Sequence, residues 1–217
     1  MIQSHVSAEL RTAPARALLA AAGLLAASPA LAHHAMGGET PQTPTQGLLS
    51  GLAHPVIGID HLAFLVVVAL LAFTLAGAAR WLAPAAFIGG TIAGTLLHVQ
   101  ALELPAAELF VAASVVLGGA LAMSARRLTP GALMLLLAGA GVLHGYAYGE
   151  SIVGAERMVL GGYLAGFALI QYAAIAGFML GLNRLAGRSG AALGAAVRSG
   201  GLGAMAVGGL FLVAGPV

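Results

Sequence analysis

The chain has 217 residues, of which 60% are hydrophobic and only 7% are charged, and its formal net charge is +2. A soluble domain carries about 25% charged residues because its surface faces water, so this composition, with a mean hydropathy of +0.99, excludes an ordinary soluble fold. It predicts an all-α, polytopic membrane protein. The sequence contains no cysteine, which excludes disulfides, thiolate metal sites and cysteine nucleophiles. Any bound metal ion would therefore have to be held by nitrogen and oxygen.

Residues 1–32 have the pattern of a cleavable export signal. Arg11 and Arg16 precede an apolar run that is too short to span a membrane, and residues 30–32, Ala-Leu-Ala, form a small-residue cleavage site. Cleavage there would make residues 33–46 a periplasmic tail and loop that begins with two histidines. The alternative is that the segment stays attached as a first transmembrane helix.

Six apolar segments of about 20 residues, the length needed to cross a bilayer, make up the rest of the chain, residues 47–217. The export signal places the mature N-terminus in the periplasm, so the loops after the first, third and fifth segments face the cytoplasm. Those loops carry more arginine than the periplasmic loops, in agreement with the positive-inside rule. We therefore expect a bacterial inner-membrane protein with about six transmembrane helices. The predicted segments are 47–78, 81–99, 106–124, 131–148, 159–182 and 191–213.

Glycine occurs 32 times. It would weaken helices in water, but in a membrane small residues let helices approach each other closely. Gly89 and Gly90 followed by Gly94, and Gly162 followed by Gly166, have the spacing of such contacts. Both motifs predict tight helix–helix packing.

Ionisable side chains inside membrane segments are costly and are therefore candidates for function. Every histidine of the predicted mature chain lies at its N-terminus or in an apolar segment, and those in the segments converge on the periplasmic half of the membrane. We predict that they bind a transition-metal cation; the alternative for each is a packed, hydrogen-bonded histidine between helices. The candidate metal ligands are His33, His34, His54, Asp60, His61, His98 and His144, and Glu108 and Glu150 are candidates for a path or for groups that orient the ligands.

His54 and His61 are seven residues apart, so a regular helix would place them on one face and about 10 Å apart along its axis. This spacing suits two successive stations on an entry path better than one close site. Pro55 frees the carbonyl of Gly51 and biases His54 away from helical backbone, which predicts broken backbone at this point; the alternative is a simple kink. Asp60, turned by about 100° from His61, is expected to orient a histidine of a neighbouring helix.

His34 would be the second residue of the mature chain. Its imidazole, its backbone nitrogen and the free amine of His33 can form fused chelate rings around Ni(II), Cu(II) or low-spin Co(II), because tetragonal nitrogen sites suit such ions. A membrane histidine could add a fourth nitrogen. The alternative is a disordered tail without a metal.

The segment 54–61, His-Pro-Val-Ile-Gly-Ile-Asp-His, resembles the His-Pro-x-x-Gly-x-Asp-His signature of the HupE/UreJ family. Glu108 with Ser114, and the segment 144–150, His-Gly-Tyr-Ala-Tyr-Gly-Glu, are similar to the later blocks of that family, in the same order along nearly the whole mature chain. One position departs from the pattern. Tyr148 stands where many members have histidine, and it is not counted among the ligands.

The resemblance implies a secondary permease for Ni²⁺ or Co²⁺, associated with hydrogenase, urease or cobalamin supply. Residues 33–37 are also similar to the start of the CbiM/NikM substrate-binding subunits, in which the amine and the second-position histidine hold the metal. The chain has no lysine, so it cannot supply the lysine of an ATP-binding loop, and uptake would be driven by a gradient or by a separate subunit. We expect lipid and the metal ion as partners, with no nucleic acid and no prosthetic cofactor, and a homo-oligomer is compatible with this fold.

Two other functions are left open by the residues alone. In an intramembrane zinc-dependent metalloenzyme, His and Asp would hold Zn²⁺ and activate water. In a haem electron carrier, paired histidines would bind the iron. The resemblance favours transport over both and implies that the protein is not an enzyme.

Overall fold

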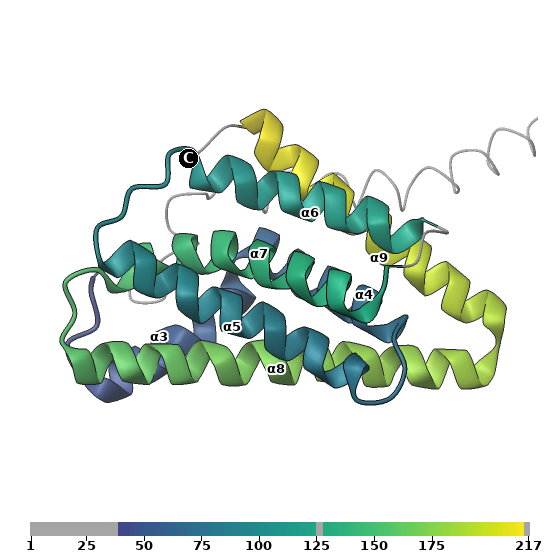
Figure 1. The fold of residues 1–217 in the computed structure, drawn as a ribbon, viewed down its shortest axis with the longest axis horizontal. Coiled ribbons are helices and arrows are strands. Elements are labelled where there is room, and N and C mark those ends of the chain that lie inside the picture. The colour runs from purple at the N-terminus through teal and green to yellow at the C-terminus, as the bar shows by residue number, and fades with distance from the viewer. Residues whose placement is uncertain (1–38, 125–127, 215–217) are drawn as a thin grey trace, which may run out of the picture.

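The computed structural model describes residues 39–124 and 128–214, and every secondary-structure element within these ranges is a helix. The predicted export signal, His33 and His34 lie outside the described residues. Figure 1 shows a bundle in which most helices run along one long axis. The elements are α3 (Pro44–Ile57), α4 (Ile59–Phe73), α5 (Ala79–Val99), α6 (Ala107–Met123), α7 (Pro130–Gly149), the short 3-10 helix η1 (Glu150–Ile152), α8 (Arg157–Arg188) and α9 (Gly190–Ala214).

Each of the six predicted segments is mostly helical. Among the described residues, α5, α7 with η1, α8 and α9 are each long and apolar enough to cross a membrane, and α3 with α4 counts as a fifth span if the bent pair is taken as one. The helix α6 has only 17 residues, but Figure 1 shows α5, α6, α7 and α8 running in turn between the two ends of the bundle. The structure thus confirms an all-α polytopic membrane fold.

The first helix begins earlier than predicted, at Pro44. The Thr43 side chain accepts the backbone N–H of Gln46 at 3.2 Å, and the Gln46 side chain accepts the N–H of Thr43. Pro44 takes the first helical position, where a missing N–H breaks no helical bond. The polar stretch 39–46, predicted to be a loop throughout, therefore gives its last residues to α3, because this capping box satisfies the first free N–H groups.

The first predicted span, 47–78, is two helices that meet at Gly58 with a bend of 76°. Gly58 has a ψ of 108°, outside the helical range, so α3 ends there. His54 and Pro55 lie inside α3, and the N–H of Gly58 still bonds to the His54 carbonyl at 3.1 Å. The prediction that Pro55 forces His54 out of the helix is wrong. The chain turns instead at the later glycine, whose helix propensity is lower than that of any residue except proline.

Three pairs of helices pack closely: α5 with α7, α3 with α8, and α6 with α9. In each pair a glycine faces the partner's backbone so closely that a Cβ would meet a carbonyl oxygen. The predicted contacts through Gly90 and Gly94, and through Gly162 and Gly166, are confirmed, whereas Gly89 faces open space. The helix α4 lies between these pairs, and it contributes more buried side chains to the main apolar cluster than any other helix.

Replacing Gly90 by alanine is expected to destabilise the bundle, whereas Gly89→Ala should not. A Cβ at Gly90 would meet the carbonyl of Ala138 on α7, but at Gly89 no described atom lies within 4 Å. Overpacking of this kind costs about 1–3 kcal/mol, and alanine raises helix propensity equally at both positions. Thermal unfolding of the purified protein in detergent should therefore show a lower Tm for Gly90→Ala only. Equal Tm values would contradict the packing of α5 on α7.

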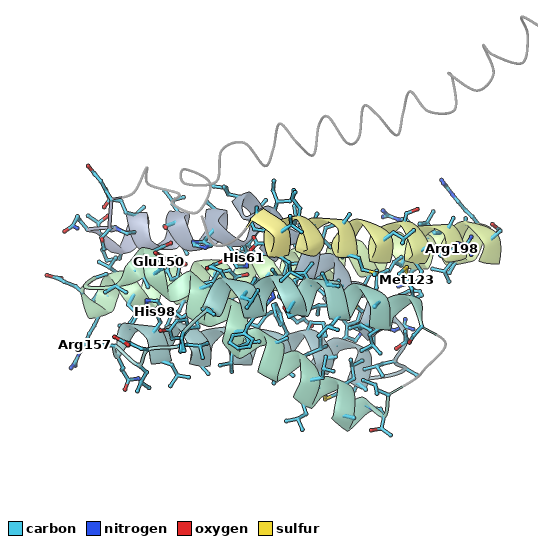
Figure 2. All side chains as sticks on the ribbon, turned by 90° about the horizontal axis from the view of Figure 1, so that it is seen from above. His61, His98, Met123, Glu150, Arg157 and Arg198 are labelled. Carbon is cyan, nitrogen blue, oxygen red and sulfur yellow. The ribbon has the colours of Figure 1, made fainter. Side chains whose placement is uncertain are left out.

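The two ends of the bundle carry different residues. Figure 2 shows His98, Glu150 and Arg157 at one end and Arg198 toward the other, with His61 between them. The loops after α4 and α8 lie at the Arg198 end, and the loops after α5 and α7 lie at the opposite end (Figure 1). Successive loops therefore alternate between the ends, as the predicted topology requires.

Candidate metal-cation site

His54 lies in the last turn of α3, buried against α8 and η1. Its Nδ1 is 3.0 Å from the hydroxyl of Ser151 and 3.3 Å from the hydroxyl of Tyr163. Tyr163 donates its own hydrogen to the carbonyl of Tyr148 at 2.8 Å, so it can only accept from His54. Nδ1 of His54 therefore carries the hydrogen, and Nε2 carries the lone pair with which an imidazole binds a metal ion.

His61, at the start of α4, and His144, on α7, form a hydrogen-bonded pair that continues to α6. Ser114 donates its hydrogen to the carbonyl of Val111 at 2.7 Å, so the 2.9 Å contact between Ser114 Oγ and His144 Nε2 is a donation by His144. Nδ1 of His144 is then an acceptor, and His61 donates to it from Nδ1 at 3.1 Å. This network assigns the lone pair of His61 to Nε2. It also makes His144 a positioning group that fixes the tautomer of His61, as partners of metal-binding histidines commonly do.

Tyr148 packs against both histidines. Its ring centroid lies 5.0 Å from that of His54 and 4.5 Å from that of His61. The side chain is completely buried, and its hydroxyl has no hydrogen-bond partner in the described part of the chain. Sequence reasoning left Tyr148 out, although it is four residues from His144 and so shares its face of α7. It missed Ser151 because nothing in the sequence distinguishes a serine in a short 3-10 helix.

The structure brings His54 and His61 together, with ring centroids 5.7 Å apart. The two stations about 10 Å apart were predicted for a regular helix, and that prediction is wrong because the chain bends at Gly58. Here the backbone approaches the His61 ring so closely that a Cβ on Gly58 would lie 2.6 Å from its Cδ2. The φ of Gly58 is −67°, so close approach rather than backbone conformation requires glycine. We call His54, His61, His144 and Tyr148 the histidine cluster.

The break places two helix ends inside the bundle. The C-terminal end of α3 carries partial negative charge and favours cations, as half-helix ends do in transporters with discontinuous helices. The N-terminal end of α4 carries partial positive charge, and Asp60 in its first turn offsets that charge. The buried Asp60 carboxylate accepts the backbone N–H of His61 at 2.8 Å. Asp60 was predicted to orient a histidine of a neighbouring helix. The hydrogen bond that the structure shows is instead to the backbone of its own helix.

The chain is similar to known proteins over most of its length. The family described as HupE / UreJ protein matches residues 19–212. The chain belongs to the HupE/UreJ family. Protein HupE from Rhizobium leguminosarum bv. viciae is 30% identical over 141 residues, which cover 65% of this chain and 70% of that protein. No solved structure matches the chain. The resemblance to the HupE/UreJ family is therefore confirmed. Segments 54–61 and 144–150, which suggested it, supply all four members of the histidine cluster.

The other candidate residues of this HupE/UreJ protein lie elsewhere. The His98 ring packs at 4.3 Å on a tyrosine ring of α7, Glu108 is half-buried in the first turn of α6, and Glu150 is exposed at the start of η1. Within residues 39–124 and 128–214, no three His, Cys, Asp or Glu side chains are arranged to hold one metal ion together. The predicted ligands that the structure brings close to one another are His54, Asp60, His61 and His144.

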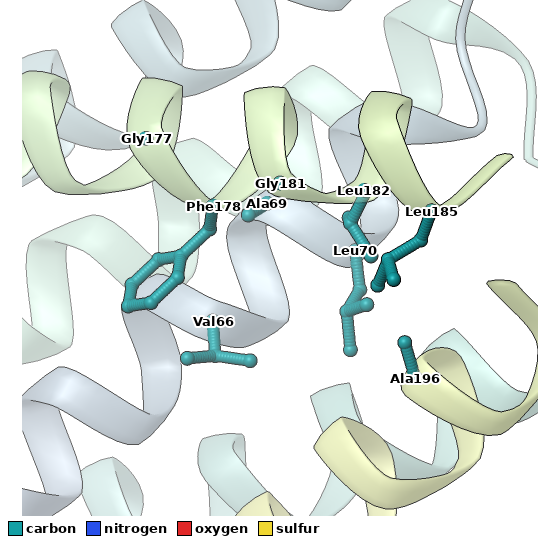
Figure 3. A pocket seen from close by; sticks show the side chains of 9 residues that line it. All are labelled: Val66, Ala69, Leu70, Gly177, Phe178, Gly181, Leu182, Leu185 and Ala196. Atoms are coloured by element: carbon teal, nitrogen blue, oxygen red, sulfur yellow. The ribbon is translucent and has the colours of Figure 1, made fainter. Parts of the chain in front are cut away.

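A separate cavity of about 270 Å³ lies between α4, α8 and α9. Figure 3 shows that its labelled lining is apolar, with Val66 and Leu70 facing Phe178 and Leu185. No member of the histidine cluster lines it. Because it offers no side-chain nitrogen or oxygen, it is not a cation site, and the histidine cluster is the candidate site.

Proposed function

We propose that this HupE/UreJ protein is a secondary transporter that takes up a divalent transition-metal cation, Ni²⁺ or Co²⁺, across the bacterial inner membrane. The observation that carries the proposal is an unbroken row of contacts that leads from Ser151, where α7 meets α8, through His54 to His61 and His144 inside the bundle. The neighbouring imidazoles of His54 and His61 let a cation exchange one ligand before it gives up another. A permeation path requires several positions of this kind, each weak enough to be left.

The ligand chemistry of this row of contacts suits a divalent cation that is neither strongly hard nor strongly soft. The hydrogen-bond network assigns a lone pair to Nε2 of both His54 and His61, and imidazole nitrogen is a good ligand for Ni²⁺ and its neighbours in the first transition series. The C-terminal end of α3 adds partial negative charge where the cation must lose part of its hydration. These features support the transport of such a cation.

We place the Ser151 end of the bundle in the periplasm. The helix α5 begins and the helix α8 ends at the opposite end of the bundle (Figure 1). By sequence the start of α5 carries Arg80 and the end of α8 carries Arg184 and Arg188, and the positive-inside rule puts such an end in the cytoplasm. The cation would enter beside Ser151, bind at the histidine cluster and leave toward the arginine-bearing end.

Export is proposed to remove residues 1–32, so that the His33 amine and His34 form a chelating tail at the periplasmic end. His34→Ala is then expected to weaken Ni²⁺ binding by about tenfold, as loss of one group at a metal site commonly does. Met36→Ala should change it little, because a thioether is a soft ligand. Calorimetry on purified protein with a sequenced N-terminus compares the two variants. Equal affinities, or an intact Met1, would show that the tail is not a chelator.

Reconstituted protein tests the function itself. Liposomes that contain the purified full chain and a metal-sensitive dye should take up Ni²⁺ or Co²⁺ with saturation, and much faster than empty liposomes. Mg²⁺ should not enter, because it prefers oxygen ligands and loses its water reluctantly. Binding requires neutral imidazole, so the affinity should fall as the pH is lowered. Rates equal to those of empty liposomes for both transition metals would refute the proposal.

A further inference from the structure

Gln171 lies in α8, completely buried within the bundle. Its Nε2 is 3.4 Å from Oγ1 of Thr91 on α5, and Thr91 donates its hydrogen to the carbonyl of Ile88 at 2.8 Å. Thr91 can therefore only accept from Gln171, which assigns the amide nitrogen to this contact and turns Oε1 away from it. Among the described residues, Oε1 of Gln171 has no hydrogen-bond partner.

Packing alone does not explain a glutamine at this position. A buried carbonyl oxygen without a donor costs about 1–3 kcal/mol, and a leucine would fill the space without that cost. The neighbouring buried side chains of α8 before and after it, Phe167 and Ile175, are apolar. An oxygen that can only accept suits a cation or the water molecules bound to one.

Side chains one helical turn before Gln171 and Thr91 contact the histidine cluster. The ring of Phe167 on α8 is 5.6 Å from that of Tyr148, and the ring of Phe87 on α5 is 6.0 Å from that of His144. The helices α5 and α7 touch at this level, since a Cβ on Gly145 would meet the carbonyl oxygen of Thr91. Gly145 directly follows His144, and Thr95 donates to the Gly145 carbonyl at 2.7 Å. Gln171, Thr91 and Thr95 therefore make polar contacts where α5 meets α8 and α7, about one helical turn from the side chains that contact the histidine cluster.

Gln171 also lies farther from the Ser151 end than His54 does. Tyr163, which contacts His54, precedes Gln171 on α8 by eight residues, or about 12 Å of helix. Beyond Gln171, the buried side chains of α8 are apolar: Ile175, Met179 and Leu182. Gln171 is thus the last buried polar side chain of α8 on the way to the arginine-bearing end.

We propose that Gln171 forms an oxygen station for the transported cation, one step beyond the histidine cluster, in which its amide carbonyl receives the partly hydrated cation from the imidazoles. The inference rests on the proposed transport function and adds a second position to the path. Imidazole suits Ni²⁺ and Co²⁺ better than an amide oxygen does, so a cation held by the cluster alone would leave it slowly. A weaker oxygen position beside the cluster gives the cation a way forward.

The test separates binding from transport. Purified Gln171→Leu should bind Ni²⁺ in calorimetry with nearly the affinity of the wild-type protein, because the histidine cluster is intact. Its maximal rate of Ni²⁺ uptake in liposomes should fall by about tenfold or more. Gln171→Glu, which keeps an oxygen at the same reach, should restore much of the rate. Gln100→Leu, at the exposed end of α5, is the matched control and should transport normally.

The possible outcomes distinguish this inference from the proposed function. Normal uptake by Gln171→Leu, next to an active wild-type protein, would overturn the oxygen station and leave the transport function standing. No uptake by the wild-type protein would overturn both. Gln171→Met has a similar shape and guards against a folding defect of the leucine variant. If neither variant yields folded protein, Gln171 is a structural residue and the proposal fails.

Discussion

His61→Ala is expected to lower the uptake of Ni²⁺ or Co²⁺ in liposomes by about 100-fold, the upper range for loss of a group at a metal site. The substitution removes the nitrogen lone pair that the hydrogen-bond network assigns to Nε2, at the point where the row of contacts turns from His54 toward His144. His54→Ala should act with similar strength. Asp60→Ala should lose about tenfold, because the carboxylate holds the backbone of His61.

Two further variants show whether such a loss is specific. His61→Gln keeps most of the side-chain volume but lacks the imidazole, so it should be inactive while its Tm stays near that of the wild-type protein. His98→Ala removes a histidine that packs on Tyr146 outside the cluster, and its uptake should be close to normal. Normal uptake by His61→Gln at matched amounts in the membrane would remove the histidine cluster from the path. A loss in His98→Ala as large as in His61→Ala would show that the path is wider than the cluster.

Gly58→Ala is expected to lower uptake by about tenfold or more, although it removes no ligand. The added methyl group would lie 2.6 Å from Cδ2 of His61, so the ring would have to leave its contact with His144. The backbone at Gly58, with a φ of −67° and a ψ of 108°, is open to alanine. The effect would therefore come from the displaced ring and not from a strained backbone.

The comparison for this variant is Gly161→Ala, which adds the same methyl group to a helix position where no described atom lies within 4 Å. Gly161→Ala should transport and bind Ni²⁺ normally. Calorimetry should show weaker Ni²⁺ binding by Gly58→Ala, with the protein still folded. Uptake by Gly58→Ala equal to that of Gly161→Ala would mean that the position of the His61 ring does not matter for transport.

The helices themselves follow from the sequence. The predicted segments 81–99 and 131–148 differ by only one or two residues from α5 (Ala79–Val99) and α7 (Pro130–Gly149). Length and hydropathy of a segment are local properties, and the bilayer sets the same length for each crossing. The motif from His54 to His61 could also be found in the sequence alone, because a histidine or an aspartate stands out among apolar residues before the fold is known.

The internal order of the cluster did not follow from the sequence. Pro55 was the natural place for a break, yet α3 continues through it and turns at Gly58, where the backbone must make room for the His61 ring. Tyr148 departs from the family pattern and was not predicted as a site residue, and its contact with two imidazoles depends on how the end of α7 meets α3 and α4. The hydroxyl groups of Tyr163 and Ser151 likewise became part of the site only through contacts between distant segments.

By itself, then, the sequence determined that this protein is a helical membrane protein of the HupE/UreJ family and which histidines and acids stand inside the membrane. Only the tertiary structure decided that His54 and His61 form one cluster and that His144 positions His61 rather than standing alone. It also decided that Gln171, with its oxygen buried, lies one helical turn beyond Phe167, which packs on Tyr148 of the cluster. The physical reason is that helix formation depends on neighbours along the chain, whereas distances between side chains of different helices depend on bends and close approaches. In this protein the close approaches occur at Gly58, next to the His61 ring, and at Gly145, next to the backbone of Thr91. A glycine in the sequence does not indicate which group will lie against it.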